Sequence, residues 1–117
     1  MNVAIVILTD GKSEEGLGRA VNALVAAKEF QQAGDEVRII FDGAGSRCLC
    51  AIADSEHQYH KLLADVRENV QGVCKYCASA YGVEEGVKAA GMPLLDDYNG
   101  HPSFRKLLAE GWQLLTF

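Results

Sequence analysis

Short apolar runs alternate along this chain with longer segments in which apolar residues recur at helical spacing, and this alternation restricts the fold more than any other feature. Residues 2–8 are almost all β-branched or apolar, as expected for a strand covered on both faces. Residues 18–33 carry an apolar helical face, and Gly34 suits the end of that helix. The pattern predicts further strands at 36–41, 70–74, 92–95 and 112–117, and further helices at 46–53, 56–68, 78–90 (as one helix or two) and 102–110, with Pro102 in the first helical position.

Strands that alternate with helices are joined by right-handed crossovers, which make neighbouring strands parallel. We therefore predict one α/β domain over residues 1–117: a three-layer sandwich with a mainly parallel sheet of about five strands and helices on both faces. Functional sites in such folds lie beyond the carboxyl ends of the strands. The sequence places residues 9–15, 42–47 and 74–77 at that edge.

Composition and charge exclude two classes of partner. The net charge is −5, and Lys and Arg are not clustered as a nucleic-acid-binding face requires. No apolar run approaches the roughly 20 residues of a membrane-spanning helix. The first apolar run has neither a basic leader nor a small-residue cleavage pattern, so we expect a strand and not a signal peptide. We expect a cytoplasmic location, where thiols stay reduced.

Several glycine-containing segments resemble nucleotide-binding motifs but lack a required residue. Gly11-Lys12-Ser13 follows a strand, yet Val6 occupies the position of the first glycine of a phosphate-binding loop. Gly16-Leu17-Gly18 and Gly43-Ala44-Gly45 both lack the third glycine of a dinucleotide fingerprint. We expect loop and cap glycines here, and no cofactor.

Four cysteines form two close pairs, Cys48/Cys50 and Cys74/Cys77, and leave several chemistries open. Together they could supply thiolates to a tetrahedral zinc ion, with His57 and His60 nearby in the sequence. However, helix positions i and i+2 point about 200° apart, so Cys48 and Cys50 would not chelate together, and we assign no metal site. Cys74 and Cys77 also have the spacing of a redox dithiol, although Lys75-Tyr76 is not the Gly-Pro pair expected between such cysteines.

A single reactive thiol is the interpretation that local geometry favours. Cys74 lies where the third strand should end and a helix should begin. Unpaired amides at a helix start favour thiolate over thiol, and Lys75 is expected to strengthen that field. We therefore predict Cys74 as the nucleophile, with Cys77 as a resolving thiol or a core residue. The alternative is that Cys74 is only a buried strand end.

These residues resemble the DsrE/DsrF-like family, which includes the TusD-type sulfur-relay subunits. The likeness spans nearly the whole chain: the opening strand, the helix after Gly16, the strand at 37–41 and the terminal segment 111–117. Its sharpest element is Cys74 followed by small residues and then Gly82-Val83, because sulfur-relay members carry their active cysteine at that place.

The resemblance implies a small α/β subunit that assembles into homo-trimers or hexamers. It also implies that Cys74 accepts sulfane sulfur as a persulfide from a donor protein and passes it to an acceptor protein, as a carrier or a sulfurtransferase. Lys12, Arg47 and Lys75 would then bind an anionic donor or an acidic segment of a partner, or would be plain surface charges. A non-catalytic oligomeric binding or scaffold protein, a cysteine-based metal site and a dithiol redox site remain as alternatives.

Overall fold

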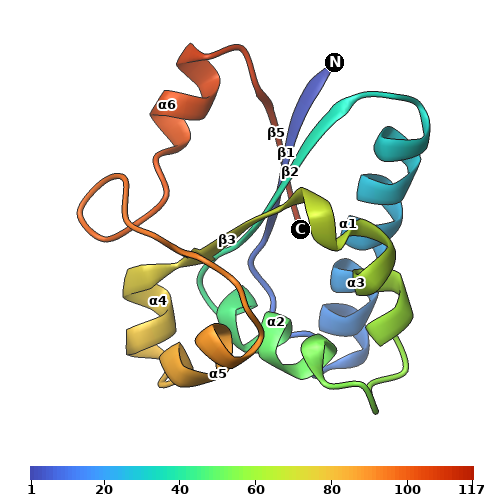
Figure 1. The fold of residues 1–117 in the computed structure, drawn as a ribbon, viewed down its shortest axis with the longest axis vertical. Helices are drawn as coiled ribbons and strands as arrows, with labels where there is room; N and C mark the ends of the chain where they lie inside the picture. The colour runs from blue at the N-terminus through green and yellow to red at the C-terminus, as the bar shows by residue number, and fades with distance from the viewer.

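The five strands form one sheet with the order β4-β3-β2-β1-β5 in the computed structural model, which describes residues 1–117 (Figure 1). Every pair of neighbouring strands is parallel. The order runs outward from β1 to β4, and the last strand then pairs with the free edge of β1. The strands are β1 (Asn2–Ile7), β2 (Glu36–Phe41), β3 (Val70–Cys74), β4 (Leu94–Leu95) and β5 (Gln113–Thr116). The predicted α/β fold class, a sandwich built on a parallel sheet, is confirmed.

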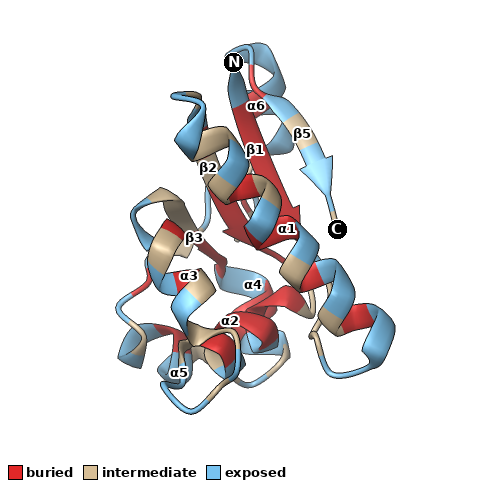
Figure 2. Ribbon diagram, turned by 90° about the vertical axis from the view of Figure 1, so that its right-hand side faces the viewer, coloured by how far each residue is buried: buried red, intermediate tan, exposed pale blue.

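Helices lie on both faces of this sheet and around its carboxyl edge (Figures 1 and 2). α1 (Glu14–Gln32) and α3 (His60–Val66) cover one face, and a 3₁₀ turn at Arg67–Asn69 leads from α3 into β3. α6 (Phe104–Ala109) lies on the other face. The short helices α2 (Gly45–Ala53), α4 (Lys75–Ala80) and α5 (Glu84–Ala89) gather near the ends of β2 and β3.

Both faces of β1 are buried, which explains its continuous apolar sequence (Figure 2). Alternate residues of a strand point to opposite faces of the sheet. Val3, Ile5 and Ile7 belong to the larger core beneath α1 and α3, whereas Ala4 and Val6 belong to a second, smaller core. That smaller core also contains Ile40, Leu107 and Trp112. The chain therefore has a thick layer on one side of its sheet and a thin layer on the other.

Several predicted helix starts differ from the observed ones, and at two of them a serine side chain caps the helix. α1 begins at Glu14, before the predicted residue 18, because the Ser13 hydroxyl accepts the Gly16 N–H at 2.9 Å. The helix predicted to start at Pro102 begins at Phe104, where the Ser103 hydroxyl accepts a backbone N–H. The helix predicted from residue 56 begins only at His60.

The strand prediction at 70–74 is confirmed. The segment at 78–90, for which one or two helices were expected, forms two, α4 and α5, and α4 starts early, at Lys75. Gly82 separates them with a φ of 70°, a left-handed conformation that suits glycine. No helix combines the length and apolar character needed to cross a bilayer.

Gly45, the first residue of α2, gives a test of how closely this helix packs on the sheet. A Cβ atom at this position would lie 1.9 Å from the Ile7 carbonyl oxygen. Gly45→Ala should therefore lower the free energy of unfolding by about 3 kcal/mol or more, measured by denaturant titration.

Gly18→Ala is the matched control, because Gly18 is exposed on α1 and a Cβ there meets nothing within 4 Å. Alanine should raise stability at this position by about 0.5–1 kcal/mol. Equal effects of the two substitutions would contradict the close approach of α2 to β1.

Candidate functional site

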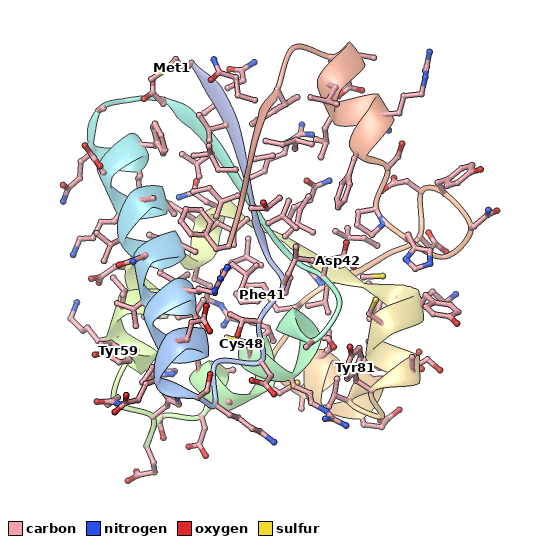
Figure 3. All side chains as sticks on the ribbon, turned by 180° about the vertical axis from the view of Figure 1, so that it is seen from behind. Met1, Phe41, Asp42, Cys48, Tyr59 and Tyr81 are labelled. Carbon is pink, nitrogen blue, oxygen red and sulfur yellow. The ribbon has the colours of Figure 1, made fainter.

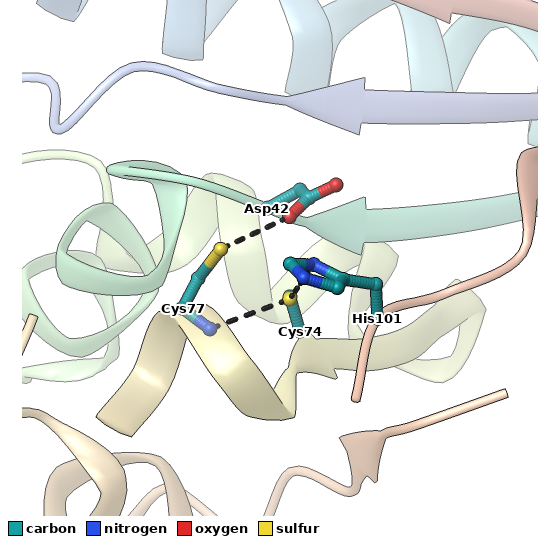
Figure 4. Close-up of side chains that lie close together, drawn as sticks. All are labelled: Asp42, Cys74, Cys77 and His101. Carbon is teal, nitrogen blue, oxygen red and sulfur yellow. Dashed lines mark hydrogen bonds between the residues drawn. The ribbon is translucent and has the colours of Figure 1, made fainter. Parts of the chain in front are cut away.

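Four side chains with metal-binding or nucleophilic chemistry meet at the carboxyl edge of the sheet (Figure 4). Asp42 directly follows β2, Cys74 ends β3, and Cys77 lies in the first turn of α4. His101 comes from the segment between β4 and α6. One ligand atom from each residue lies within 4.8 Å of the other three. Two of these residues, Cys74 and Cys77, are the predicted catalytic pair.

Each sulfur atom of this cluster contacts a different partner. Cys74 Sγ lies 3.2 Å from His101 Nδ1 and accepts the Cys77 backbone N–H at 3.4 Å. Cys77 Sγ donates to Asp42 Oδ1 at 3.4 Å. Figure 4 shows Cys74 facing the imidazole ring and Cys77 facing the carboxylate. The cluster therefore contains a thiol–imidazole pair beside a thiol–carboxylate pair.

The turn from β3 into α4 sets the positions of the two cysteines. Cys74 is the N-cap residue of α4, with φ −54° and ψ 121°, so its side chain folds back over the first helical turn. The spacing of three residues places Cys77 one turn further, with its N–H directed at Cys74 Sγ. A thiol here takes the place that a serine or threonine hydroxyl takes at other helix starts.

A tight turn brings His101 back to the sheet edge. His101 and Tyr98 exchange two backbone hydrogen bonds of 2.8 Å, and Asn99 and Gly100 between them have φ values of 49° and 83°. The Gly100 carbonyl accepts the Tyr76 N–H at 2.9 Å, which ties the turn to α4. The Tyr76 ring also packs at 4.8 Å from the imidazole ring. These contacts hold the imidazole over Cys74.

Asp42 is fixed by its own backbone and by its neighbour. Its N–H donates to the Ile7 carbonyl at 2.9 Å, and the Gly43 N–H donates to Asp42 Oδ1 at 2.8 Å. Only 9% of Asp42 is exposed. The carboxylate is therefore held beside Cys77 by a strand end that continues the β1–β2 pairing (Figure 3).

Burial controls the ionisation of both thiols. Cys74 has no exposed surface, and desolvation raises the pKa of its thiol to about 12 despite the opposing hydrogen bond from the Cys77 N–H. Burial likewise raises the pKa of Cys77, with a further increase from the Asp42 carboxylate. Burial therefore outweighs the predicted effect of the helix start, which does lower the pKa of Cys74, and the expected thiolate is disfavoured in this conformation. One backbone hydrogen bond and a six-residue helix do not compensate for the loss of water.

The three cations predicted to bind substrate lie outside this cluster. Lys75 adjoins Cys74 in the sequence, but its Nζ lies 3.7 Å from an Asp96 carboxylate oxygen. The Arg47 guanidinium lies over the Tyr81 ring at 5.0 Å, at the far end of α4. Lys12 borders a separate cavity of about 170 Å³ together with Cys48 and His57.

The remaining cysteines do not join Cys74 and Cys77. Cys48 is buried in α2, away from Asp42 (Figure 3). Cys50 Sγ lies 3.9 Å from the Val83 carbonyl on the other side of that helix. A zinc site made of all four cysteines, one of the alternatives open from the sequence, is therefore not assembled.

A cavity of about 510 Å³ adjoins the cluster. Asp42 and His101 form part of its wall, and the rest comes from the segment that leads into α6. The other lining residues are Tyr98, Pro102, Ser103, Phe104 and Arg105. His101 therefore both lines this cavity and contacts the sulfur of Cys74.

His101 is the site residue that the sequence analysis missed, because it directly precedes Pro102 at the start of an expected helix. A signal was present: the strand predicted at 92–95 runs parallel to the third strand, so the segment after it returns to the same sheet edge. Asp42 did lie within the predicted edge segment 42–47, although no role was assigned to it.

The comparisons with known proteins agree with the fold and name no activity. No family model matches the chain. An uncharacterized protein of Methanocaldococcus jannaschii is 28% identical over 116 residues, which cover 98% of this chain and 94% of the relative. A conserved protein of unknown function from Bacteroides thetaiotaomicron has a similar solved structure, with a TM-score of 0.66 at 14% identity over 99% of this chain and 94% of that one. The resemblance to the DsrE/DsrF-like family therefore stays a prediction.

The raised pKa of Cys74 predicts slow alkylation of the native protein. At pH 7, iodoacetamide should modify Cys74 at least about 100-fold more slowly than in the unfolded chain, whose thiols have a pKa near 8.5. Because the folded thiol titrates near pH 12, the native rate should rise about tenfold per pH unit between pH 8 and 11, whereas the unfolded rate levels off above about pH 9.

Peptide mapping by mass spectrometry after timed labelling gives the rate at Cys74 alone. The same protein in guanidinium chloride is the control. Equal native and unfolded rates at pH 7 would contradict the buried, protonated thiol.

Proposed function

We propose that this protein carries sulfane sulfur as a persulfide on Cys74 and passes it to a partner protein. The observation that carries the proposal is the 3.2 Å contact between Cys74 Sγ and His101 Nδ1. A buried thiol with a high pKa needs a base at the moment of attack, and this imidazole is within hydrogen-bonding reach. The resemblance to sulfur-relay proteins, in which the active cysteine occupies the place of Cys74, supports the same function.

The loading step transfers one sulfur atom from a donor persulfide, R–S–SH. Cys74 Sγ attacks the terminal sulfur while His101 Nδ1 takes the thiol proton. A bond forms between Cys74 Sγ and that sulfur, and the bond from that sulfur to the donor's inner sulfur breaks. The donor leaves as a thiolate and receives the proton from His101, so the products are R–SH and the Cys74 persulfide. No net oxidation occurs, and the step needs no oxidant.

The route to Cys74 passes His101. Cys74 has no exposed surface, and the 510 Å³ cavity reaches the imidazole but not the sulfur. Displacement of the imidazole ring toward the cavity is therefore part of the proposal. The turn that carries His101 is held by the backbone bonds of Tyr98 and Gly100, and none of residues 98–101 is fully buried.

Cys77 determines how long the persulfide lasts without an acceptor. Its sulfur can attack the inner sulfur of the Cys74 persulfide, form a Cys74–Cys77 disulfide and release hydrosulfide. Asp42 opposes this reaction, because it accepts the Cys77 S–H and raises the pKa of that thiol. The carboxylate thus keeps the second thiol protonated and slow to attack.

The partners belong to the same proposal. A homo-trimer or hexamer, separate donor and acceptor proteins and a cytoplasmic location are what the family resemblance implies. Exposed apolar side chains near the cavity support an assembly or docking face there: Tyr98, Phe104 and Leu108 are 66%, 37% and 58% exposed. Lys75 adjoins Cys74 in the sequence and Arg105 lines the cavity, and in this proposal both bind an anionic segment of the donor.

Intact-mass spectrometry after exposure to glutathione persulfide tests the function. The wild-type chain should gain about 32 Da, the mass of one sulfur atom. Cys74→Ala should abolish this adduct, and His101→Gln should slow its formation by about 100-fold or more, because the base is lost. Cys77→Ala should keep the adduct and lengthen its lifetime.

Cys50→Ser is the matched control, since Cys50 lies outside the cluster, and it should load like the wild type. An adduct of equal yield in Cys74→Ala would overturn the proposal. So would an unchanged loading rate in His101→Gln.

A further inference from the structure

The four clustered side chains have the composition of a protein ligand set for a transition-metal ion. We infer that one zinc-class divalent cation binds at the carboxyl edge of the sheet, held by Asp42, Cys74, Cys77 and His101. The inference concerns metal binding alone and does not depend on sulfur transfer.

The donor chemistry selects the class of ion. Two thiolates, an imidazole nitrogen and a carboxylate oxygen are ligands that zinc accepts. Hard cations such as Mg²⁺ and Ca²⁺ prefer oxygen ligands throughout and are not expected here. The Cys-x-x-Cys spacing of Cys74 and Cys77 is also a common spacing of zinc ligands.

The observed separations are close to those of a tetrahedral site. Bonds of about 2.3 Å to sulfur and about 2.0 Å to nitrogen or oxygen place neighbouring ligand atoms roughly 3.3–3.8 Å apart. Cys74 Sγ and His101 Nδ1 are 3.2 Å apart, Cys77 Sγ and Asp42 Oδ1 are 3.4 Å apart, and no pair exceeds 4.8 Å. Closing the widest pair therefore needs a contraction of about 1 Å.

The backbone around the cluster can orient these ligands. The Cys77 N–H already donates to Cys74 Sγ, and the Gly43 N–H donates to Asp42 Oδ1. Such hydrogen bonds from outside the ligand set fix ligand geometry and tune metal affinity. His101 is held at the same point by the turn from Tyr98 and by the Tyr76 ring. The cavity beside Asp42 and His101 provides an entry path.

The metal would join four separate segments: the end of β2, the end of β3, the first turn of α4 and the turn before α6. Binding should therefore raise the thermal stability of the folded chain. If the proposed function holds, a bound cation also prevents persulfide formation, because it occupies the sulfur of Cys74. Metal binding and sulfur loading would then exclude each other.

Titration of the reduced, metal-free full-length chain with Co²⁺ under anaerobic conditions tests the inference. We expect one Co²⁺ per chain, with thiolate-to-metal charge-transfer absorption and the intense visible bands of tetrahedral cobalt. Zn²⁺ should displace the cobalt and raise the melting temperature. Asp42→Asn, Cys77→Ser and His101→Gln should each weaken binding by at least about 100-fold.

Cys50→Ser and His60→Gln are the controls, because they remove a thiol and an imidazole that lie outside the cluster. Both should bind cobalt like the wild type, and circular dichroism should show that each variant is folded. Binding that survives both Asp42→Asn and His101→Gln unchanged would overturn the four-ligand site and leave only a dithiol chelate. No cobalt spectrum at millimolar metal would also overturn it.

The persulfide assay separates this inference from the proposed function. Absent metal binding with intact loading on Cys74 would contradict the metal site alone. Metal binding with no loading on Cys74 would support the metal site and contradict the sulfur carrier.

Discussion

The parallel pairing of β2 with β1 on one side and β3 on the other is the constraint on which the site depends. Phe41 pairs with both Ile7 and Val73, so the next residues along β2 and β3, Asp42 and Cys74, emerge side by side at the sheet edge. The β1 contribution is backbone only, through the Ile7 carbonyl that accepts the Asp42 N–H. Because β1 is buried on both faces, this edge is supported by the best-packed strand in the molecule. A carboxylate and a sulfur are thus held together by backbone register before any side-chain contact forms.

The cluster combines two opposing effects on its thiols. Burial favours the neutral thiol at both cysteines, and the Asp42 charge reinforces it at Cys77. A neighbouring imidazole and a backbone N–H favour loss of the Cys74 proton during reaction or metal binding. A neutral thiol reacts slowly with oxidants, since the thiolate is the reactive form. In both proposals, a sulfur donor or a cation takes over the negative charge when Cys74 loses its proton.

The order of strands and helices, the parallel sheet and the position of Cys74 were all predictable from the sequence, because strand runs and turns are local patterns. The β3 run ends at Cys74 in a clear strand-to-helix turn. Functional sites of parallel α/β folds lie beyond the carboxyl ends of the strands, so Cys74 is expected at that edge of the sheet. The ionisation state of Cys74 was not predictable. It depends on how deeply the rest of the chain covers that sulfur. The helix start alone predicts a lowered pKa for Cys74, whereas burial raises it.

The contacts of His101 and of the three predicted cations were likewise not predictable from local sequence patterns. His101 reaches Cys74 through a turn whose direction depends on Asn99 and Gly100 adopting left-handed conformations, and no apolar periodicity marks that turn. The three cations follow strand ends as predicted: Lys75, Arg47 and Lys12. The contacts of such long side chains depend, however, on which groups lie near them in the folded chain. Lys75 approaches Asp96 and Arg47 covers Tyr81, and both partners come from other segments of the chain.

The shortness of β4 has a mechanical consequence. This edge strand pairs with β3 over only two residues, Leu94 and Leu95, and it leads directly into the segment that carries His101. Fraying of a two-residue edge breaks few hydrogen bonds and leaves the remaining four strands intact. His101 thus follows the shortest strand of the sheet, whereas Asp42, Cys74 and Cys77 lie at the ends of the interior strands β2 and β3. Fraying of β4 would let His101 move away from Cys74 and would open access to the sulfur atoms, and the buried core would stay folded.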